Sequence, residues 1–135
     1  MPTSENIKDF IKTVKRWAAS KIDIHAVAMV GSYARGAAAL KSDIDLVIIM
    51  DDPRSYLENT DWLQDFGMPE KQELEDYGLV TSLRAWFHDG KEVEFGLTTP
   101  VWISSPLDEG TRKTIRDGMQ VLFEREPTLS PLLSI

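Results

Sequence analysis

Residues 22–50 read IDIHAVAMVGSYARGAAALKSDIDLVIIM, two apolar runs rich in β-branched residues on either side of a segment of small residues. Residues 22–30 predict a strand buried on both faces, and residues 42–50 predict a second strand. The glycine and alanines of residues 31–40 are typical of a tight turn that enters a short helix. Pro53 lies just beyond the second strand and lacks the N–H group that a sheet requires, so we expect this strand to end before it.

A helix is predicted on the N-terminal side of this stretch, over residues 4–20, with Ser4 as its cap. Its apolar residues recur at helical spacing, at Ile7, Phe10, Ile11, Val14, Trp17 and Ala18. On the C-terminal side, residues 54–77 mix aromatic and acidic residues, and we interpret them as one or two short helices.

Two strand-like runs, residues 79–88 and 91–99, are separated by Asp89-Gly90, which is a strong signal for a hairpin. A two-residue turn at this point would place Ala85 opposite Glu94 and direct Arg84 to the other face of the sheet. Because Arg84 interrupts an apolar run, we also consider that it pairs with Glu94 or meets a phosphate.

The remaining chain predicts a loop over residues 100–105, a helix over 107–117 that stops at Gly118, a strand over 119–124 and an irregular tail. Helices interleaved with strands and an antiparallel hairpin imply an α/β (α+β) fold. We therefore expect residues 1–135 to form a single domain, with a mixed sheet of about five strands and helices packed against it.

Composition narrows the classes of function. A formal net charge of -7 disfavours a long nucleic-acid partner, because such binding depends on neutralising phosphates with basic residues. The chain has no cysteine, which leaves oxygen-ligated metals as candidates. The N-terminus has no secretory signal pattern and no apolar run approaches a membrane span, so we expect a cytoplasmic protein without membrane contact.

GSYARG, residues 31–36, comes directly after the first predicted strand, where Gly31 lets the backbone turn and lets a phosphate approach closely. The Ser32 hydroxyl and neighbouring N–H groups can hold anionic oxygens. Ala37 follows where a Walker A loop needs lysine, and neither the dinucleotide glycine pattern nor the GxSxG nucleophile elbow is present. These residues therefore predict a phosphate site of another kind, in which Arg35 and Ser42 are further candidate contacts.

Asp43 and Asp45 lie two residues apart in a predicted strand, so their side chains leave the same face about 7 Å apart. Glu92 and Glu94 share a face of the later hairpin strand, and Glu94 is preferred as the third acid because it interrupts an apolar run. Such acids suit Mg²⁺ bound together with substrate phosphates, with two ions expected and Mn²⁺ as an alternative. Glu94 would complete this metal site or accept the proton of an attacking hydroxyl.

GSYARG followed by SDIDL resembles the signature of the DNA polymerase beta-like nucleotidyltransferase superfamily, in particular its minimal members and the aminoglycoside nucleotidyltransferases. The resemblance implies a nucleotidyltransferase fold that transfers a nucleoside monophosphate, with ATP expected as donor, to a hydroxyl of an unknown small-molecule or protein acceptor. It also implies that Gly31 and Ser32 hold the triphosphate, while Asp43, Asp45 and Glu94 bind the metal ions.

Two alternatives remain open from the sequence. The chain is also similar to the minimal nucleotidyltransferase antitoxins, which implies a partner-binding module that contacts a helical protein. A glutamate at the third acidic position is also compatible with a degenerate domain that binds nucleotide without turnover. We expect a homodimer or a protein partner, because so small a chain has little surface of its own with which to bind the acceptor.

Overall fold

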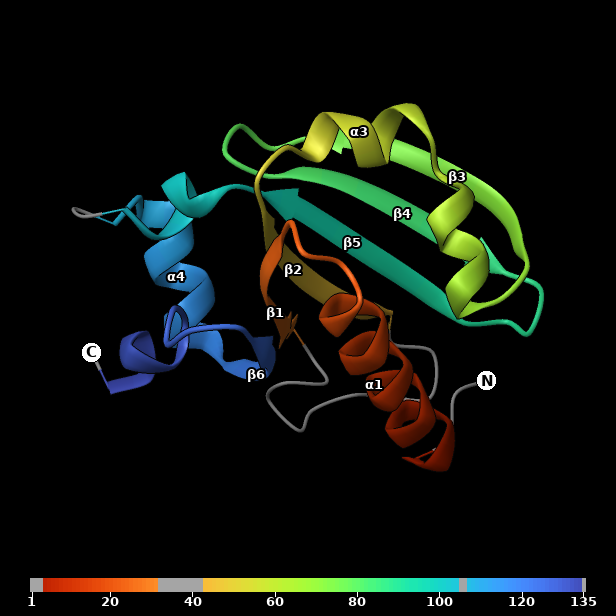
Figure 1. The fold of residues 1–135 in the computed structure, drawn as a ribbon, viewed down its shortest axis with the longest axis horizontal. Coiled ribbons are helices and arrows are strands. Elements are labelled where there is room, and N and C mark those ends of the chain that lie inside the picture. Colours follow the sequence, from red (N-terminus) through yellow and green to blue (C-terminus); the bar gives the residue numbers. More distant parts are fainter. Residues whose placement is uncertain (1–3, 32–42, 105–106, 135) are drawn as a thin grey trace.

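The computed structural model describes residues 4–31, 43–104 and 107–134, and within these ranges a six-stranded mixed sheet forms the centre of the molecule (Figure 1). The strand order is β3-β4-β5-β2-β1-β6, in which β2 and β5 are parallel and all other neighbours are antiparallel. The predicted mixed sheet with packed helices is thus confirmed. The strands are β1 Ile24–Val30, β2 Ile44–Met50, β3 Pro69–Asp76, β4 Thr81–Phe87, β5 Glu92–Thr98 and β6 Met119–Glu124.

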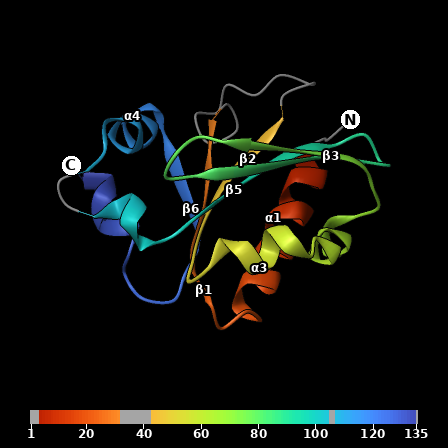
Figure 2. The ribbon, with the colours of Figure 1, turned by 90° about the horizontal axis from the view of Figure 1, so that it is seen from above.

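Helices lie on both sides of this sheet, and Figure 2 shows the two groups from above. One face carries α1, α3 and η1, while η2, α4 and η3 lie on the other side near β6 (Figures 1 and 2). None of the helices in the described ranges combines the length and apolarity needed to cross a membrane. The α-helices are α1 Ser4–Ala19, α3 Pro53–Glu58 and α4 Glu109–Asp117. The short 3₁₀ helices, labelled η, are η1 Asp61–Phe66, η2 Pro100–Ile103 and η3 Ser130–Ser134.

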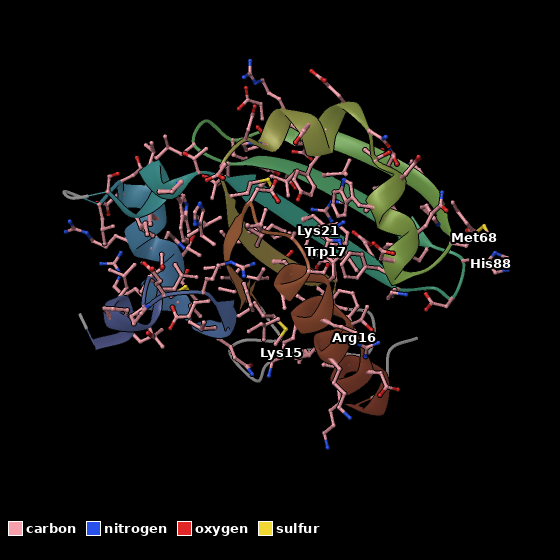
Figure 3. All side chains as sticks on the ribbon, viewed as in Figure 1. Lys15, Arg16, Trp17, Lys21, Met68 and His88 are labelled. Carbon is pink, nitrogen blue, oxygen red and sulfur yellow. The ribbon has the colours of Figure 1, made fainter. Side chains whose placement is uncertain are left out.

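The main core contains an aromatic cluster between the sheet and the helices α1 and η1. The ring of Phe95 on β5 lies 5.0 Å from the ring of Trp62 and 5.3 Å from that of Phe66, measured between centroids. Trp17 on α1 stacks on Trp62 at 5.4 Å, and Figure 3 shows how the side chains fill this layer. The apolar stripe predicted for α1 therefore packs against η1, and the aromatic rings of η1 pack in turn against the strand that carries Glu94.

The structure corrects the interpretation of residues 54–77, in which helices alone were predicted. Residues 53–66 do form α3 and η1, but Pro69–Asp76 is the edge strand β3, paired antiparallel with β4. Seven of its eight residues are exposed, and charged residues dominate it, so the alternation that identifies a half-buried strand is missing. Three smaller differences remain in the described ranges. Ile22 is 89% exposed and precedes β1, η2 occupies residues 100–103 of the predicted loop, and η3 replaces irregular chain in the tail.

The hairpin register also differs from the expectation of a two-residue turn. The N–H of Phe87 donates to the carbonyl of Lys91, so three residues form the loop, and only Gly90 among them has positive φ, at 95°. The additional loop residue shifts the pairing by one position. Arg84, and not Ala85, therefore lies directly opposite Glu94 and on the same face of the sheet.

We predict that Phe95→Ala lowers the free energy of unfolding by about 3–5 kcal/mol, because it leaves a cavity in the aromatic cluster. Phe123→Ala is the matched control, since Phe123 on β6 is only partly buried at the margin of the core. Urea unfolding of both variants measures the difference. Equal losses for the two variants would contradict the central position assigned to Phe95.

Candidate functional site

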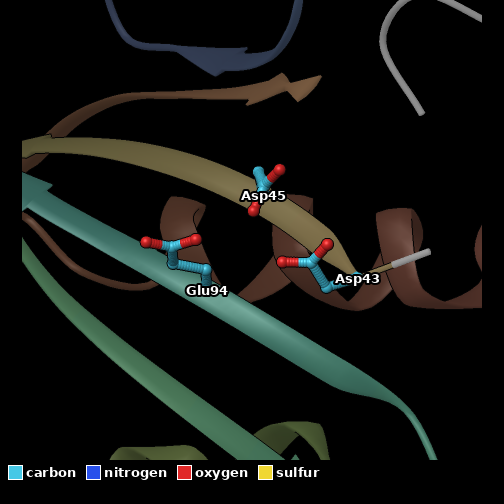
Figure 4. A group of neighbouring side chains, drawn as sticks. All are labelled: Asp43, Asp45 and Glu94. Atoms are coloured by element: carbon cyan, nitrogen blue, oxygen red, sulfur yellow. The ribbon is translucent and has the colours of Figure 1, made fainter. Parts of the chain in front are cut away.

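Charged side chains from three adjacent strands, β2, β5 and β4, lie on the face of the sheet turned away from α1, and Figure 4 shows the acids among them. Val30 on β1 is paired with Asp45 on β2, Asp45 with Glu94 on β5, and Glu94 with Arg84 on β4. Residues directly opposite one another on paired strands point to the same face. The register therefore places an acidic residue of β2, an acidic residue of β5 and the positively charged Arg84 of β4 close together.

Asp43, Asp45 and Glu94 converge at the beginning of β2 (Figure 4). One carboxylate oxygen from each lies within 4.8 Å of the other two, and all three residues are partly buried. Asp43 directly precedes β2, while Asp45 and Glu94 are held at paired positions of two parallel strands. The three acids named from the sequence thus lie within the reach of a single cation, or of two neighbouring ones.

Arg84 binds this cluster directly, contrary to the orientation that a two-residue turn would have given it. Its Nη1 donates to Asp43 at 3.2 Å and also to Glu92, while its Nη2 donates to Glu94 at 2.9 Å. The hydrogen bond to Glu92, followed by the charges of Glu94 and Asp43, raises the pKa of Arg84 above its usual value despite partial burial. Glu92 therefore lies at the site as the partner of Arg84, outside the set of three converging oxygens.

Ser82 is a member of the site that we did not predict. It is 3% exposed, and its hydroxyl donates to Oε1 of Glu94 at 2.7 Å. The only signal in the sequence is a small polar residue two positions before Arg84 in an otherwise apolar run, which places both on one face. The partner of Ser82 depends on the hairpin register, and the register predicted from the sequence is wrong by one residue.

Asp45 is the acid whose charge is least compensated. Its Oδ1 is buried without a hydrogen-bond partner among the described residues. Burial, together with the nearby charges of Asp43 and Glu94, raises the pKa of Asp45 to about 8. A buried acceptor oxygen without a donor, beside two further carboxylates, fits a divalent cation, which would supply the missing positive charge.

Gly31, at the end of β1, is placed directly against this acid. Its φ is 74°, in the left-handed region, and a Cβ at this position would lie well inside contact distance of Oδ2 of Asp45. Glycine is therefore needed here both for the turn and for the room that the Asp45 carboxylate occupies. The predicted phosphate contacts Ser32, Arg35 and Ser42 lie outside the described residues.

Comparison with known proteins places this site in a family. The nucleotidyltransferase domain family matches residues 7–122, a range that contains the acids, Arg84 and Gly31. The chain belongs to the nucleotidyltransferase domain family, which confirms the resemblance to the DNA polymerase beta-like nucleotidyltransferase superfamily that the sequence motif indicated.

Three similar proteins from Methanocaldococcus jannaschii carry protein adenylyltransferase names. One is 35% identical over 77 residues, which is 57% of this chain and 66% of the relative, so the match spans slightly less than two thirds of that relative. Another is 32% identical over 77 residues, covering 57% of this chain and 76% of the relative. Nucleotidyl transfer to a protein is thus the activity named for these relatives.

Solved structures support the fold. An aminoglycoside 6-adenyltransferase from Bacillus subtilis superimposes with a TM-score of 0.57 at 18% identity, over 76% of this chain and 37% of that protein. A cytoplasmic RNA terminal U-transferase gives a TM-score of 0.55 at 13% identity, over 83% of this chain and 32% of that protein. The present chain spans about a third of each of these proteins, and the likeness shows a shared fold.

We predict that metal-free wild-type protein loses stability relative to Asp45→Asn as pH rises. Above about pH 3.8 the unfolded chain releases the Asp45 proton, whereas the folded chain keeps it until about pH 8. Because the folded state then holds the extra proton, the free energy of unfolding falls across this window, by about 1–3 kcal/mol between pH 5 and pH 8 after solvent screening. Urea unfolding in EDTA measures this; parallel pH profiles for the two proteins would contradict it.

We also predict that Gly31→Ala disturbs the site more than a comparable substitution elsewhere. Gly78→Ala is the matched control, because Gly78 also has positive φ, at 86°, but has nothing within 4 Å of an added Cβ. Both changes introduce backbone strain of about 1 kcal/mol, and only Gly31→Ala also displaces the Asp45 carboxylate. Thermal unfolding and Mn²⁺ titration should separate them, and equal Mn²⁺ affinities would show that the contact with Asp45 is unimportant.

Proposed function

We propose that the chain transfers AMP from ATP to a hydroxyl group of a protein and releases pyrophosphate. The observation that carries this proposal is the convergence of Asp43, Asp45 and Glu94 beside Gly31, with a buried oxygen of Asp45 that lacks a partner among the described residues. Membership of the nucleotidyltransferase domain family supports the reaction class. The names of the archaeal relatives support a protein as the acceptor.

Asp43, Asp45 and Glu94 are proposed to hold two Mg²⁺ ions, or Mn²⁺ in their place. When bound, such cations would neutralise the triphosphate and stabilise the negative charge that develops on the oxygens of the reacting phosphate. Arg84 uses three hydrogen bonds to carboxylates, and a guanidinium has five N–H donors, so it retains donors for a phosphate oxygen. Gly31, Ser32, Arg35 and Ser42 would hold the triphosphate.

In the proposed reaction, the acceptor hydroxyl oxygen forms a bond to the α-phosphorus of ATP. The bond from that phosphorus to the oxygen bridging to the β-phosphorus breaks, and pyrophosphate leaves with its electron pair. A carboxylate of the site accepts the hydroxyl proton. Positioning and charge neutralisation are the main demands that such a reaction makes on a protein.

Partial exposure of two of the acids supports access of a macromolecular acceptor to the site. The side chains of Asp43 and Glu94 remain 32% and 21% exposed, while their carboxylates are held on a rigid sheet. We propose that a second protein, or a second copy of this chain, provides the surface that positions the hydroxyl group. The chain's acidic balance, with a net charge of -7, favours such a partner over a long nucleic acid.

We predict that label from α-³²P-ATP, and not from γ-³²P-ATP, is transferred to an acceptor protein co-purified with the chain, in a Mg²⁺-dependent manner. Asp43→Asn should lower the rate by about 100-fold or more, because it weakens charge neutralisation at the reacting phosphate. Asp51→Asn is the matched control, since Asp51 follows the other end of β2 and pairs with His25. Transfer of the γ-label would identify a kinase instead.

ATP binding provides the decisive control for the metal site. Calorimetry with Mg²⁺ should detect ATP binding to the wild type and its loss in the double variant Asp43→Ala with Asp45→Ala. A folded double variant that binds ATP as tightly as the wild type would contradict the proposal. Binding in the wild type without transfer to any co-purified protein would instead support a nucleotide-binding module without turnover.

A further inference from the structure

We infer that Ser82 is a positioning residue that fixes the direction of the Glu94 carboxylate, and thereby sets the affinity of the site for a divalent cation. This inference rests on the proposed function, because it concerns the same metal site. Ser82 itself would touch neither the nucleotide nor the acceptor, since it is 3% exposed and its hydroxyl is engaged with Glu94.

Both oxygens of Glu94 are held from the neighbouring strand β4. Oε1 accepts a hydrogen bond from Ser82 at 2.7 Å, and Oε2 accepts one from Arg84 at 2.9 Å. Ser82 and Arg84 are two residues apart on β4, so their side chains stand on the same face. This pair of donors fixes the plane of the carboxylate and leaves further lone pairs of its oxygens for a cation.

The cross-strand register makes the contact with Ser82 possible. Ser82 lies opposite Gly96, whereas Glu94 lies opposite Arg84. Because Gly96 has no side chain, the Ser82 hydroxyl can reach diagonally toward Glu94. An added Cβ at Gly96 would come within 3.0 Å of the Leu46 carbonyl oxygen and 3.1 Å of Val80, so this space is limited by its neighbours.

Ser82 and Arg84 are not equivalent as donors. Arg84 also binds Asp43 and Glu92, so its position depends on three acids, and a cation that binds Asp43 competes with one of its bonds. Ser82 is neutral, and in the described part of the chain its hydroxyl bonds to Glu94. Glutamate has one more rotatable bond than aspartate, and a dedicated donor offsets that freedom. Ser82 therefore keeps Glu94 directed into the cluster when Arg84 rearranges.

The test compares Ser82→Ala with Thr98→Val in the full chain. Thr98 is also buried, lies on the same face of β5 as Glu94, and donates its hydroxyl to the backbone carbonyl of Leu79. Mn²⁺ is the probe, with unbound Mn²⁺ measured by electron paramagnetic resonance in the absence of nucleotide. We expect Ser82→Ala to weaken Mn²⁺ binding about 10-fold or more, Thr98→Val to leave it within a factor of two, and Ser82→Thr to restore most of it.

Circular dichroism and thermal unfolding establish that each variant is folded at the temperature of the titration. If Ser82→Ala does not fold, Ser82→Cys replaces it, because a thiol is a weak donor of similar size and should also weaken Mn²⁺ binding. In assays of transfer, the variant should need more Mg²⁺ for half-maximal rate, with little change in KM for ATP at saturating Mg²⁺.

Asp45→Asn in the same titration separates the hypothesis of a metal site from the hypothesis that Ser82 positions Glu94. Retained Mn²⁺ binding in Asp45→Asn would remove the proposed metal site itself. Loss of binding in Asp45→Asn together with wild-type affinity in Ser82→Ala would overturn only the role of Ser82. Equal weakening by Ser82→Ala and Thr98→Val would also overturn it, because the effect would then follow any lost buried hydroxyl.

Discussion

The repulsion among Asp43, Asp45 and Glu94 is the constraint on which the rest of the site depends. Carboxylate oxygens within 4.8 Å of one another destabilise the ionised cluster unless positive charge or donated hydrogen bonds offset it. Arg84 binds two of these acids, while Oδ1 of Asp45 is left without a partner among the described residues. The arrangement is therefore electrostatically incomplete at one defined point, and a bound cation would complete it.

The sheet makes this unfavourable arrangement possible. Asp45 and Glu94 alternate with apolar residues that are buried on the face carrying α1, α3 and η1, namely Ile44, Leu46, Val93 and Phe95. Burial of these apolar neighbours stabilises the two central strands and offsets the cost of placing acids side by side. Phe95 is central to this effect, because it anchors β5 in the aromatic cluster immediately beside Glu94.

Much of this architecture could be predicted from local patterns. Burial imposes a pattern on apolar residues, and this pattern identified β1, β2 and α1 in the sequence. The acids could be recognised because they interrupt or begin such apolar runs. Strand β3 could not be recognised, because an exposed edge strand such as Pro69–Asp76 needs no apolar alternation. The contacts of Ser82, Arg84 and Glu92 depend on the length of a hairpin loop. One additional loop residue was enough to reverse the expected direction of Arg84.

The guanidinium of Arg84 also bears on the order in which folding and metal binding would occur. Because two of the converging acids share a counter-charge that the chain itself provides, part of their repulsion is offset without an external ion. With the proposed metal site, folding and loading with metal would then be separate events. A newly made chain would mature where free divalent ions are scarce and become competent when they arrive together with their nucleotide.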